Sequence, residues 1–362
     1  MQNNQVMVAM SGGVDSTVAA ALLKQQGYQV KGALMRLYQP EKQEKQVEKS
    51  CGSSKDLQDA QKAADFLQID FSIYDFHEAF CQYVIDPFVE SYFRGETPNP
   101  CMICNRKMKF GAFLQRAQLM ECSYMATGHY ARIEYDPTAQ RHLIRKAVDT
   151  TKDQTYMLSV LSQQQLAHIL LPLGGLLKTQ VRELAQQMDL AIAAKPDSQD
   201  ICFVPDGDYT VFLQRYRDRS LIPGNFVDAQ GTILGQHKGV GCYTIGQRKG
   251  LGIALGHPAF VIDKDASSNT VTLGTSEDLM RKRVFIREVN YIPFEKLHAP
   301  MAVSAVCRYH QKEQSAILHP LGDNTALLEF ESSQRAPAPG QTAVFYHGDY
   351  VVGSGIIDYT QP

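Results

Sequence analysis

The segment Ser11-Gly12-Gly13-Val14-Asp15-Ser16 contains the residue types and spacing that most clearly indicate chemistry. Its glycines let the backbone approach a ligand without a Cβ in the way. A helix that starts directly after them presents N–H groups and the positive end of its dipole to an anion. The serine hydroxyls add donors, and Asp15 suits such a cradle if a divalent cation bridges it to phosphate. The segment therefore predicts an ATP site from which pyrophosphate leaves with its metal.

Two common nucleotide-binding motifs are absent from the same segment. It lacks the Gly-Lys-Ser/Thr ending of a Walker A loop, which disfavours a kinase or GTPase. It also lacks the Gly-x-Gly-x-x-Gly spacing of a dinucleotide site. An ordinary turn built from small residues is the plain alternative, and the complete hexapeptide at the first strand–helix junction argues against it.

Sulfur is the second source of chemistry, since the chain has eight cysteines and two form Cys101-Met102-Ile103-Cys104. A lone C-x-x-C is compatible with half of a zinc site, a redox pair or part of an iron–sulfur site. Zinc is disfavoured because the sequence has no second C-x-x-C and no histidine cluster. Cys202, between apolar neighbours, is either a packing residue or a functional thiol, and the residues alone leave both readings open.

Apolar runs alternate with helical patterns in the first half, which predicts an α/β domain with an open, mostly parallel sheet. Strands are expected at 6–10, 29–35, 69–74 and 124–130, and helices at 17–23, 55–67, 77–93, 108–114 and 180–188. Thr179 is expected to cap the last helix, Thr97-Pro98-Asn99-Pro100 to form a rigid, extended break, and the charged stretch 39–50 to be a loop. Met35 and Gly128 fall at carboxyl ends of strands, where such sheets bind ligands.

The second half has a different residue pattern. Glycines and short alternating runs dominate after Cys202, and from about Arg283 the pattern is all-β, with alternating runs at 302–309, 326–330 and 342–346. This predicts a small C-terminal barrel or sandwich. We expect three domains: a catalytic α/β domain at 1–205, a small central domain at 206–280 and a β-barrel-like domain at 281–362.

Composition limits the partners and the location. The chain has 36 basic and 38 acidic residues, so its net charge of −2 gives no sign of a nucleic-acid partner. Local basic clusters favour a surface that follows phosphates, and they are Arg106-Lys107-x-Lys109, Arg215-x-Arg217-x-Arg219, Arg248-Lys249 and Arg281-Lys282-Arg283. No apolar segment is long enough for a bilayer and no secretory signal is evident. We therefore expect a cytoplasmic protein with no membrane partner and mostly reduced thiols.

Taken together, these motifs make the chain resemble the bacterial tRNA-specific 2-thiouridylases of the PP-loop ATP pyrophosphatase superfamily. The segments that carry the resemblance are 11–16, Thr97–Pro100 with Cys104-Asn105, Ala126–Tyr130, Lys152–Gln154, Asp197-Ser198 with Ile201–Phe203, Thr244–Leu251 and Pro339–Gln341. The resemblance implies an adenine-nucleotide alpha-hydrolase-like fold for the first domain and tRNA contacts for the central one.

The same resemblance implies an enzyme, a tRNA-uridine 2-sulfurtransferase that uses ATP and Mg²⁺. It would adenylate the 2-oxo group of the wobble uridine at tRNA position 34 and transfer sulfur from a cysteine persulfide, giving 2-thiouridine, AMP and pyrophosphate. Cys104 matches the nucleophile and Cys202 the persulfide carrier, with a transient disulfide between them. A sulfur-relay persulfide donor protein is the implied partner beside tRNA.

Binding residues also follow from the resemblance. The positions that match ATP contacts are Ala9, Met10, Ser11, Gly12, Gly13, Val14, Asp15, Ser16, Met35 and Gly128. The positions that match tRNA contacts are His129, Lys152, Asp153, Gln154, Arg308, Tyr309 and Gln341. Elementary chemistry agrees, because adenylation turns a uracil oxygen into a good leaving group and a thiolate is a strong nucleophile. A stacked anticodon base must also be splayed out to react.

One departure from the resemblance concerns Cys101, since many relatives carry at this position an Asp that is associated with acid/base work. The thiol puts that assignment in doubt and creates a second hypothesis, a 4Fe-4S cluster on Cys101, Cys104 and Cys202 that delivers hydrosulfide. Two more distant alternatives are a PP-loop ligase acting on a small metabolite and a non-catalytic RNA-binding or metal-storage module. The thiols would be idle in the first, and the ATP loop argues against the second.

Overall fold

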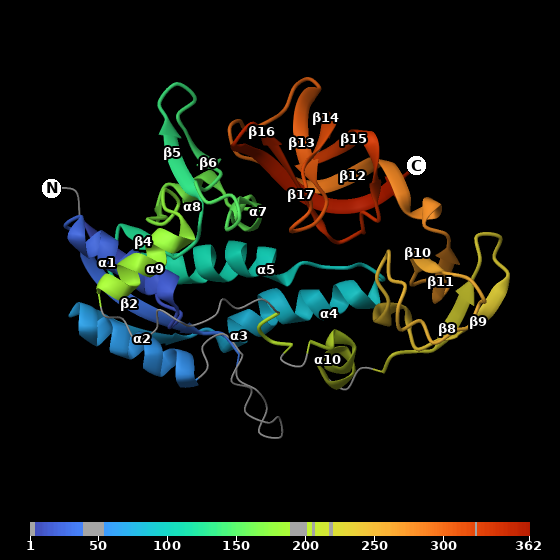
Figure 1. Cartoon of the computed structure of the whole chain (residues 1–362), viewed down its shortest axis with the longest axis horizontal. Coiled ribbons are helices and arrows are strands. Elements are labelled where there is room, and N and C mark those ends of the chain that lie inside the picture. The colour runs from blue at the N-terminus through green and yellow to red at the C-terminus, as the bar shows by residue number, and fades with distance from the viewer. Residues whose placement is uncertain (1–3, 39–53, 189–200, 205–206, 217–219, 323) are drawn as a thin grey trace. The chain divides into compact units, whose positions relative to one another are not determined.

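The computed structural model describes residues 4–38, 54–188, 201–204, 207–216, 220–322 and 324–362 (Figure 1). The predicted loop at 39–50 and the motif Asp197-Ser198 lie outside these residues. The chain divides into two compact units. The first comprises Met1–Val84, Cys101–Gly207 and Asp349–Val351, and the second comprises Ile85–Pro100, Asp208–Gly348 and Val352–Pro362. In the described part of the chain, no helix has the length and apolar character needed to cross a membrane.

A five-stranded sheet forms the centre of the first unit, with the order β3-β2-β1-β4-β7 and parallel pairing throughout. The strands are β1 (Gln5–Ala9), β2 (Gln29–Arg36), β3 (Asp70–Asp75), β4 (Tyr124–Ala126) and β7 (Ile169–Leu170). Chain order reverses at β1, because β2 lies on one side of it and β4 on the other. Open α/β sheets bind ligands at such a switch point, beyond the carboxyl end of the strand. The predicted open, mostly parallel α/β fold is confirmed.

Helix α1 (Val14–Gln25) explains how the glycine segment is anchored. Ala20, Ala21 and Leu23 pack into the core that contains the interior of β1. Val18 and Ala19, on another side, pack against helix α9 (Lys178–Gln187). Small side chains allow this close double packing, and the helix is therefore buried along most of its length. The start of α1 is fixed in place by its own apolar residues.

The remaining helices of the first unit and of the segment that follows it are α2 (Ser54–Leu67), α3 (His77–Phe80), η1 (Cys81–Ile85), α4 (Asp86–Phe93), α5 (Pro100–Ile103), η2 (Cys104–Phe113), α6 (Leu114–Leu119), α7 (Thr155–Leu158) and α8 (Gln163–Leu166). Strands β5 (Arg132–Asp136) and β6 (Arg141–Arg145) form an antiparallel hairpin. The elements η1 and η2 are π-helical, with a wider hydrogen-bonding ladder than an α-helix.

Three of the boundaries that differ from the sequence prediction bear on the site. The helix expected at 108–114 begins already at Pro100, so Cys101 and Cys104 lie inside it; proline suits a first helical position because its N–H would have no helical partner. The strand expected at 124–130 ends at Ala126. Helix α9 begins at Lys178 and is capped at Leu177, whose N–H donates to the Gln180 side chain; Thr179 is not the cap.

The second unit contains a small sheet and a closed barrel. The sheet has the order β10-β11-β8-β9. The barrel runs β12-β15-β14-β13-β16-β17 and closes where β17 pairs with β12. Its interior holds alternating apolar residues such as Ile286, Leu318, Leu328 and Phe345. The prediction of a barrel or sandwich is thereby resolved in favour of the barrel.

The elements of this unit are α10 (Tyr209–Arg215), β8 (Gly224–Val227), β9 (Ile233–His237), η4 (Val240–Cys242), β10 (Phe260–Asp265), β11 (Thr270–Gly274), η5 (Glu277–Leu279), β12 (Met280–Tyr291), β13 (Met301–Val306), β14 (Gln314–Gly322), β15 (Thr325–Arg335), β16 (Thr342–His347) and β17 (Tyr350–Gln361).

Candidate active site

The glycine segment forms a tight turn between β1 and α1. Ser16 Oγ accepts a hydrogen bond from Ser11 N at 3.2 Å and donates one to Gly13 O at 3.1 Å. Thr17 Oγ1 also donates to Gly13 O at 3.1 Å. Gly12 has a positive φ of 69°, and a Cβ there would lie 2.4 Å from the Asp56 carbonyl oxygen, so only glycine fits.

Asp15 lies in the first turn of α1, and both of its carboxylate oxygens are engaged. Lys178 Nζ lies 2.8 Å from Oδ1 and 2.7 Å from Oδ2, and the Tyr130 hydroxyl donates to Oδ1 at 2.8 Å. The ammonium group also lies 5.7 Å from the centre of the Tyr130 ring. A protein cation therefore occupies the position that the sequence reading gave to a bridging metal ion. Asp15 can bind a divalent cation only if its ion pair with Lys178 is replaced by the bond to the metal.

Lys178 is the main site residue that the sequence reading missed. It is 8% exposed, and the first residue of α9. Its backbone N–H donates to Asp149 Oδ2 at 2.9 Å, which holds the helix start against the 146–155 loop. Nothing in the sequence pattern indicates that Lys178 pairs with the distant Asp15. A buried lysine beside an anion-binding turn has a clear chemical use, because it can neutralise phosphate charge.

Gly128 is brought against the glycine segment, as its expected place at the end of a strand requires. A Cβ on Gly128 would lie 2.7 Å from the Asp15 carbonyl carbon and 2.8 Å from Ser16 N. The turn after β4 therefore packs directly on the first turn of α1. Met35 lies near the carboxyl end of β2, the strand adjacent to β1, and pairs with Tyr74 of β3. These positions surround the switch point of the sheet.

Two expected tRNA-contacting residues brace the same region. Gln154 Oε1 accepts from Tyr130 N at 2.9 Å, and Gln154 N donates to Tyr130 O at 2.9 Å. Asp153 Oδ1 accepts from Ala147 N at 2.8 Å, and burial raises the pKa of its carboxyl. Both side chains are therefore used in holding the loop that follows β6 close to Tyr130.

His129 and Lys152 are two further expected tRNA-contacting residues of the first unit. His129 Nδ1 lies 2.7 Å from Thr127 Oγ1. Burial, together with the positive charge of Lys109, holds the pKa of His129 well below its usual range, so the imidazole is neutral at physiological pH. Lys152 is half-buried, and its backbone N–H donates to Asp149 O at 3.1 Å.

The cysteines differ in exposure: Cys101 is exposed, Cys202 half-buried and Cys104 9% exposed. Asn105, next to Cys104, donates from Nδ2 to Met157 O at 3.3 Å, while its buried Oδ1 has no hydrogen-bond partner among the described residues. Phe203 packs edge-on against Phe80, with ring centres 5.7 Å apart. This contact fixes the chain next to Cys202. Among the residues that the structure describes, no three Cys, His, Asp or Glu side chains are grouped closely enough to hold a metal ion.

The other expected tRNA-contacting residues belong to the second unit. Arg308 is exposed and follows β13, and the ring of Tyr309 lies 3.9 Å from that of His310. Gln341 Nε2 donates to Thr97 O at 2.8 Å. Gln341 thus has an internal partner in this structure, on the extended segment that precedes Cys101.

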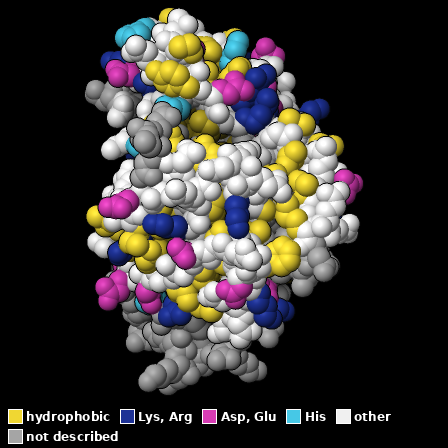
Figure 2. Space-filling view, turned by 90° about the vertical axis from the view of Figure 1, so that its left-hand side faces the viewer, with side chains coloured by type: hydrophobic (Ala, Val, Ile, Leu, Met, Phe, Trp, Pro, Cys, Tyr) yellow, Lys and Arg dark blue, Asp and Glu magenta, His cyan; other side chains and the backbone are white. Residues whose placement is uncertain are grey.

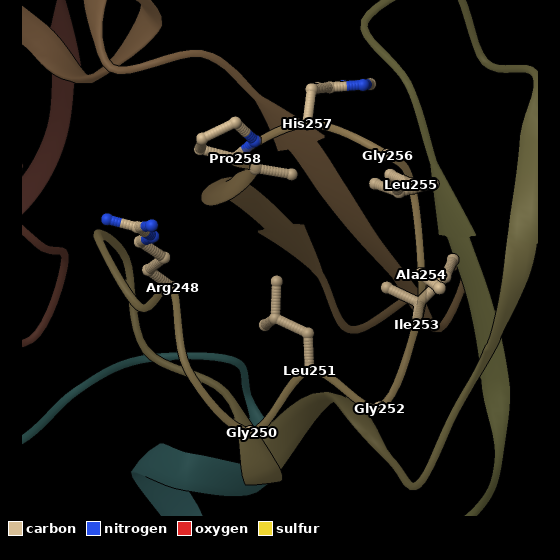
Figure 3. Close-up of a pocket in the computed structure, with 11 residues that line it drawn as sticks. Arg248, Gly250, Leu251, Gly252, Ile253, Ala254, Leu255, Gly256, His257 and Pro258 are labelled. Carbon is tan, nitrogen blue, oxygen red and sulfur yellow. The ribbon is translucent and has the colours of Figure 1, made fainter.

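A hollow of about 740 Å³ lies within the loop 248–259 of the second unit (Figure 3). Leu251 points into it and Arg248 lies at its edge. The lining is mostly aliphatic side chains and glycine backbone. The hollow therefore lacks the polar groups of a nucleotide site, although exposed Arg248 and Lys249 give the loop a basic edge.

Charge is mixed on one face of the molecule. On the face shown in Figure 2, Lys and Arg side chains are interspersed with Asp and Glu. Arg106, Lys107 and Lys249 are exposed. Arg217 and Arg219 of one expected basic cluster lie outside the described residues.

Comparison with known proteins agrees with the fold. Family models described as the tRNA methyl transferase HUP domain, the tRNA methyl transferase PRC-barrel domain and the aminomethyltransferase beta-barrel domain match residues 4–206, 210–275 and 281–357. The tRNA-specific 2-thiouridylase MnmA of Clostridioides difficile is 47% identical over 98% of both chains.

Two further relatives extend the match. The tRNA-specific 2-thiouridylase MnmA 2 of Caldanaerobacter subterraneus is 48% identical over 99% of this chain and 98% of its own length. The tRNA-specific 2-thiouridylase MnmA of Acetivibrio thermocellus is 48% identical over 99% of this chain and all of its own length. Identity at this level over the whole chain shows common descent, and the chain belongs to the family of tRNA-specific 2-thiouridylases.

Proposed function

We propose that this chain catalyses the ATP-dependent 2-thiolation of the wobble uridine of tRNA. The observation that carries the proposal is the arrangement of Asp15, Lys178 and Gly128 around the start of α1. It provides an anion site with a protein cation beside it, as expected where pyrophosphate departs. The family membership supplies tRNA and sulfur as the other reactants. Although the matching family models are described by methyl transfer, the curated relatives and the ATP-type loop both favour thiolation.

Activation comes first in the proposed reaction. The uridine O2 attacks the α-phosphorus of ATP, the bond to the β-phosphate oxygen breaks, and pyrophosphate leaves with the electron pair. The N–H groups at the start of α1 and the Lys178 ammonium stabilise the charge on the phosphates. Mg²⁺, held by Asp15 together with the phosphates, would supply further charge neutralisation. The uracil oxygen is then part of AMP, which is a good leaving group.

Sulfur transfer follows. A donor protein of the sulfur relay loads a persulfide on Cys202, and its terminal sulfur attacks C2 of the adenylated base. The Cys104 thiolate then attacks Cys202 Sγ, a disulfide forms between the two cysteines, the electron pair passes to the transferred sulfur, and AMP leaves. An external thiol reductant restores both thiols. In a variant of this step, Cys104 releases hydrosulfide, which attacks C2 directly.

A 4Fe-4S cluster on Cys101, Cys104 and Cys202 is the second candidate for sulfur delivery. The replacement of an acidic residue by Cys101 motivates it, while the absence of a metal-binding group of three side chains in the described residues gives it no support. Anaerobic purification followed by iron and sulfide analysis separates the two routes. Full thiolation by iron-free protein would eliminate the cluster.

The more distant alternative is a PP-loop ligase that acts on a small metabolite. Pyrophosphate release separates this alternative from tRNA thiolation. We expect release from ATP to require unmodified tRNA and to be lost in Asp15→Asn. Release that occurs equally without tRNA would refute the proposed substrate.

Two further proposals follow from a tRNA substrate. The enzyme would act in the cytoplasm, where mature tRNA is found. The chain would consist of three domains, at residues 1–205, 206–280 and 281–362. The first would bind ATP, and all three would contact tRNA. His129, Lys152, Asp153, Gln154, Arg308, Tyr309 and Gln341 are the proposed tRNA contacts.

A further inference from the structure

Residues Glu96–Pro98, here called the strap, join α4 to the helix that carries Cys101 and Cys104. The strap is held by the loop Pro339–Gln341, which lies between β15 and β16 of the barrel. Thr97 N donates to Pro339 O at 2.8 Å, and Gln341 Nε2 donates to Thr97 O at 2.8 Å and to Pro98 O at 3.5 Å. Both backbone polar groups of Thr97 are thus bonded to one barrel loop.

Gly340 brings this loop into direct contact with the strap. Its φ is +89°, and a Cβ on it would lie 2.8 Å from Glu96 Cβ and 2.9 Å from Thr97 N. The loop itself is tied to β17, because Gly340 N donates to Ile357 O at 2.8 Å and Ile357 N donates to Gln341 O at 2.8 Å. No side chain larger than hydrogen fits at residue 340 unless the strap or the loop moves.

Glu96 adds a charged link. Arg287 of β12 donates from its guanidinium to Glu96 Oε1 at 3.0 Å, and Arg94 donates to Oε2 at 2.8 Å. Thr97, in contrast, is 8% exposed and its hydroxyl has no partner among the residues that the structure describes. The strap is therefore held through its backbone and through Glu96, not through the Thr97 side chain.

We propose that Pro339-Gly340-Gln341 is a clamp that positions the cysteine helix, with Gly340 and Gln341 as its positioning residues. Helix α5 starts two residues after the strap, at Pro100, whose fixed φ leaves the chain little freedom there. A displacement of the strap therefore passes along the chain to Cys101 and Cys104. The expected effect of the clamp on catalysis rests on the proposed role of Cys104 in sulfur transfer. Its effect on the position of Cys101 and Cys104 does not depend on that role.

Gly340→Ala tests the clamp, with Gly322→Ala as its matched control. Gly322 is also a barrel glycine with a positive φ, +96°, and a Cβ there meets nothing within 4 Å. Thiolation by Gly340→Ala should have a kcat lower by roughly 10- to 100-fold than that of Gly322→Ala, because misplacement of a reacting group is costly. The KM for tRNA should agree within about threefold.

A second readout does not depend on activity. The rate at which iodoacetamide alkylates Cys104, measured by peptide mass spectrometry against Cys242 in the same sample, should change by at least about threefold in Gly340→Ala and not in Gly322→Ala. This readout reports on the clamp even if wild-type protein made no 2-thiouridine.

Two results would overturn the clamp. One is equal kcat and equal Cys104 alkylation in the two glycine variants. The other is a rise in the KM for tRNA in Gly340→Ala with unchanged kcat and unchanged Cys104 alkylation, which would leave the loop with its proposed tRNA contact at Gln341 and no role in positioning the cysteine helix. Should Gly340→Ala fail to fold, Gln341→Met keeps the glycine and removes the donor to Thr97 O. Because Gln341 is also a proposed tRNA contact, this variant is judged by its kcat and by Cys104 alkylation, not by its KM for tRNA.

Discussion

The glycine segment and the cysteine helix belong to the same unit but are held in different ways. At the glycine segment, Asp15 is bonded through both oxygens, and Gly128 packs directly on the helix start. At the cysteine helix, the backbone is π-helical from Cys104 to Phe113, and Asn105 Oδ1 is buried without a partner among the described residues. Single π-helical turns are frequent at functional sites, and a catalytic role is one of the explanations for a buried unsatisfied polar atom.

Under the proposed function, this difference means that the two half-reactions make different structural demands on the protein. In the proposed mechanism, activation needs a rigid anion site, whereas sulfur transfer needs a cysteine helix that can accommodate several sulfur species. Changes on one side should therefore leave the other half-reaction largely intact. The following variants test that separation.

Cys202→Ser should have the largest effect. It removes the proposed persulfide carrier, so the thiolation rate should fall by at least roughly 10³-fold, as when other enzymes lose a nucleophile. Release of pyrophosphate in the presence of tRNA should persist, because activation does not use this thiol. Cys242→Ser, at a half-buried thiol of the second unit, is the control and should retain activity. Loss of both half-reactions in Cys202→Ser would show that they are not separable.

Lys178→Met should reduce kcat/KM for ATP by roughly 10²-fold, the usual effect of removing one donor to a developing charge. It also leaves Asp15 without its cation. The free energy of unfolding should drop by about 2 kcal/mol, less than for a fully buried pair, because Asp15 keeps part of its solvent contact.

A double variant separates these two effects. Asp15→Asn combined with Lys178→Met should recover stability in urea unfolding without recovering activity. Activity of Lys178→Met equal to that of wild type would remove this residue from the ATP site.

Gly128→Ala should weaken ATP binding by roughly tenfold, because the added Cβ would lie under 3 Å from the Asp15 and Ser16 backbone and must displace the helix start. Gly175→Ala is the matched control, since a Cβ there meets nothing within 4 Å. Isothermal titration with a non-hydrolysable ATP analogue measures the difference. Equal affinities would show that the contact between the β4 turn and α1 does not shape the site.

His129 gives a pH-dependent prediction. Its pKa in the folded state lies well below its usual value of about 6.5, so the folded protein binds fewer protons than the unfolded chain. Its contribution to stability is therefore complete above about pH 6.5 and is lost as the pH falls towards the folded pKa. Between pH 7 and pH 5 the wild type should lose about 1–2 kcal/mol more than His129→Gln.

Urea unfolding at several pH values measures this slope. Burial also lowers the pKa values of His142 and His237. These two residues are present in the wild type and in His129→Gln, so their effect on stability cancels when the two proteins are compared. Parallel pH profiles would contradict the neutral, desolvated state of His129.

Thr97→Val should have the smallest effect. The hydroxyl it removes is buried and unpartnered among the described residues, so stability should stay within about 1 kcal/mol or rise slightly. Thiolation should be unchanged, because the strap is held through its backbone. A clear loss of activity would indicate that the Thr97 hydroxyl has a partner in the reacting complex.

Much of the fold and part of the site were predictable from local pattern. Apolar runs located the parallel strands, and the hexapeptide at 11–16 located the ligand-binding turn at the first strand–helix junction because its chemistry is local. That this turn lies at the switch point of the sheet is seen only in the structure. Gly128 was expected at a strand end and lies against Asp15.

What could not be predicted depends on distant contacts. Lys178 pairs with Asp15 across 163 positions of the chain, and no local pattern marks such a pair. The start of α9 was misjudged because the Gln180 side chain bonds to Leu177 N, a cap that does not need Thr179. Gln341 resembled a tRNA contact, but its present partner on the strap is visible only in three dimensions.

The central claim is that this chain replaces the 2-oxo group of a wobble uridine with sulfur at the expense of ATP. The most direct test incubates unmodified tRNA with the protein, ATP, magnesium and a persulfide source. Mass spectrometry then analyses both the nucleosides of the tRNA and the ribonuclease fragment that contains position 34. The account predicts 2-thiouridine at position 34, with one AMP and one pyrophosphate formed for each sulfur transferred. An absence of 2-thiouridine, or a methylated nucleoside in its place, would contradict it.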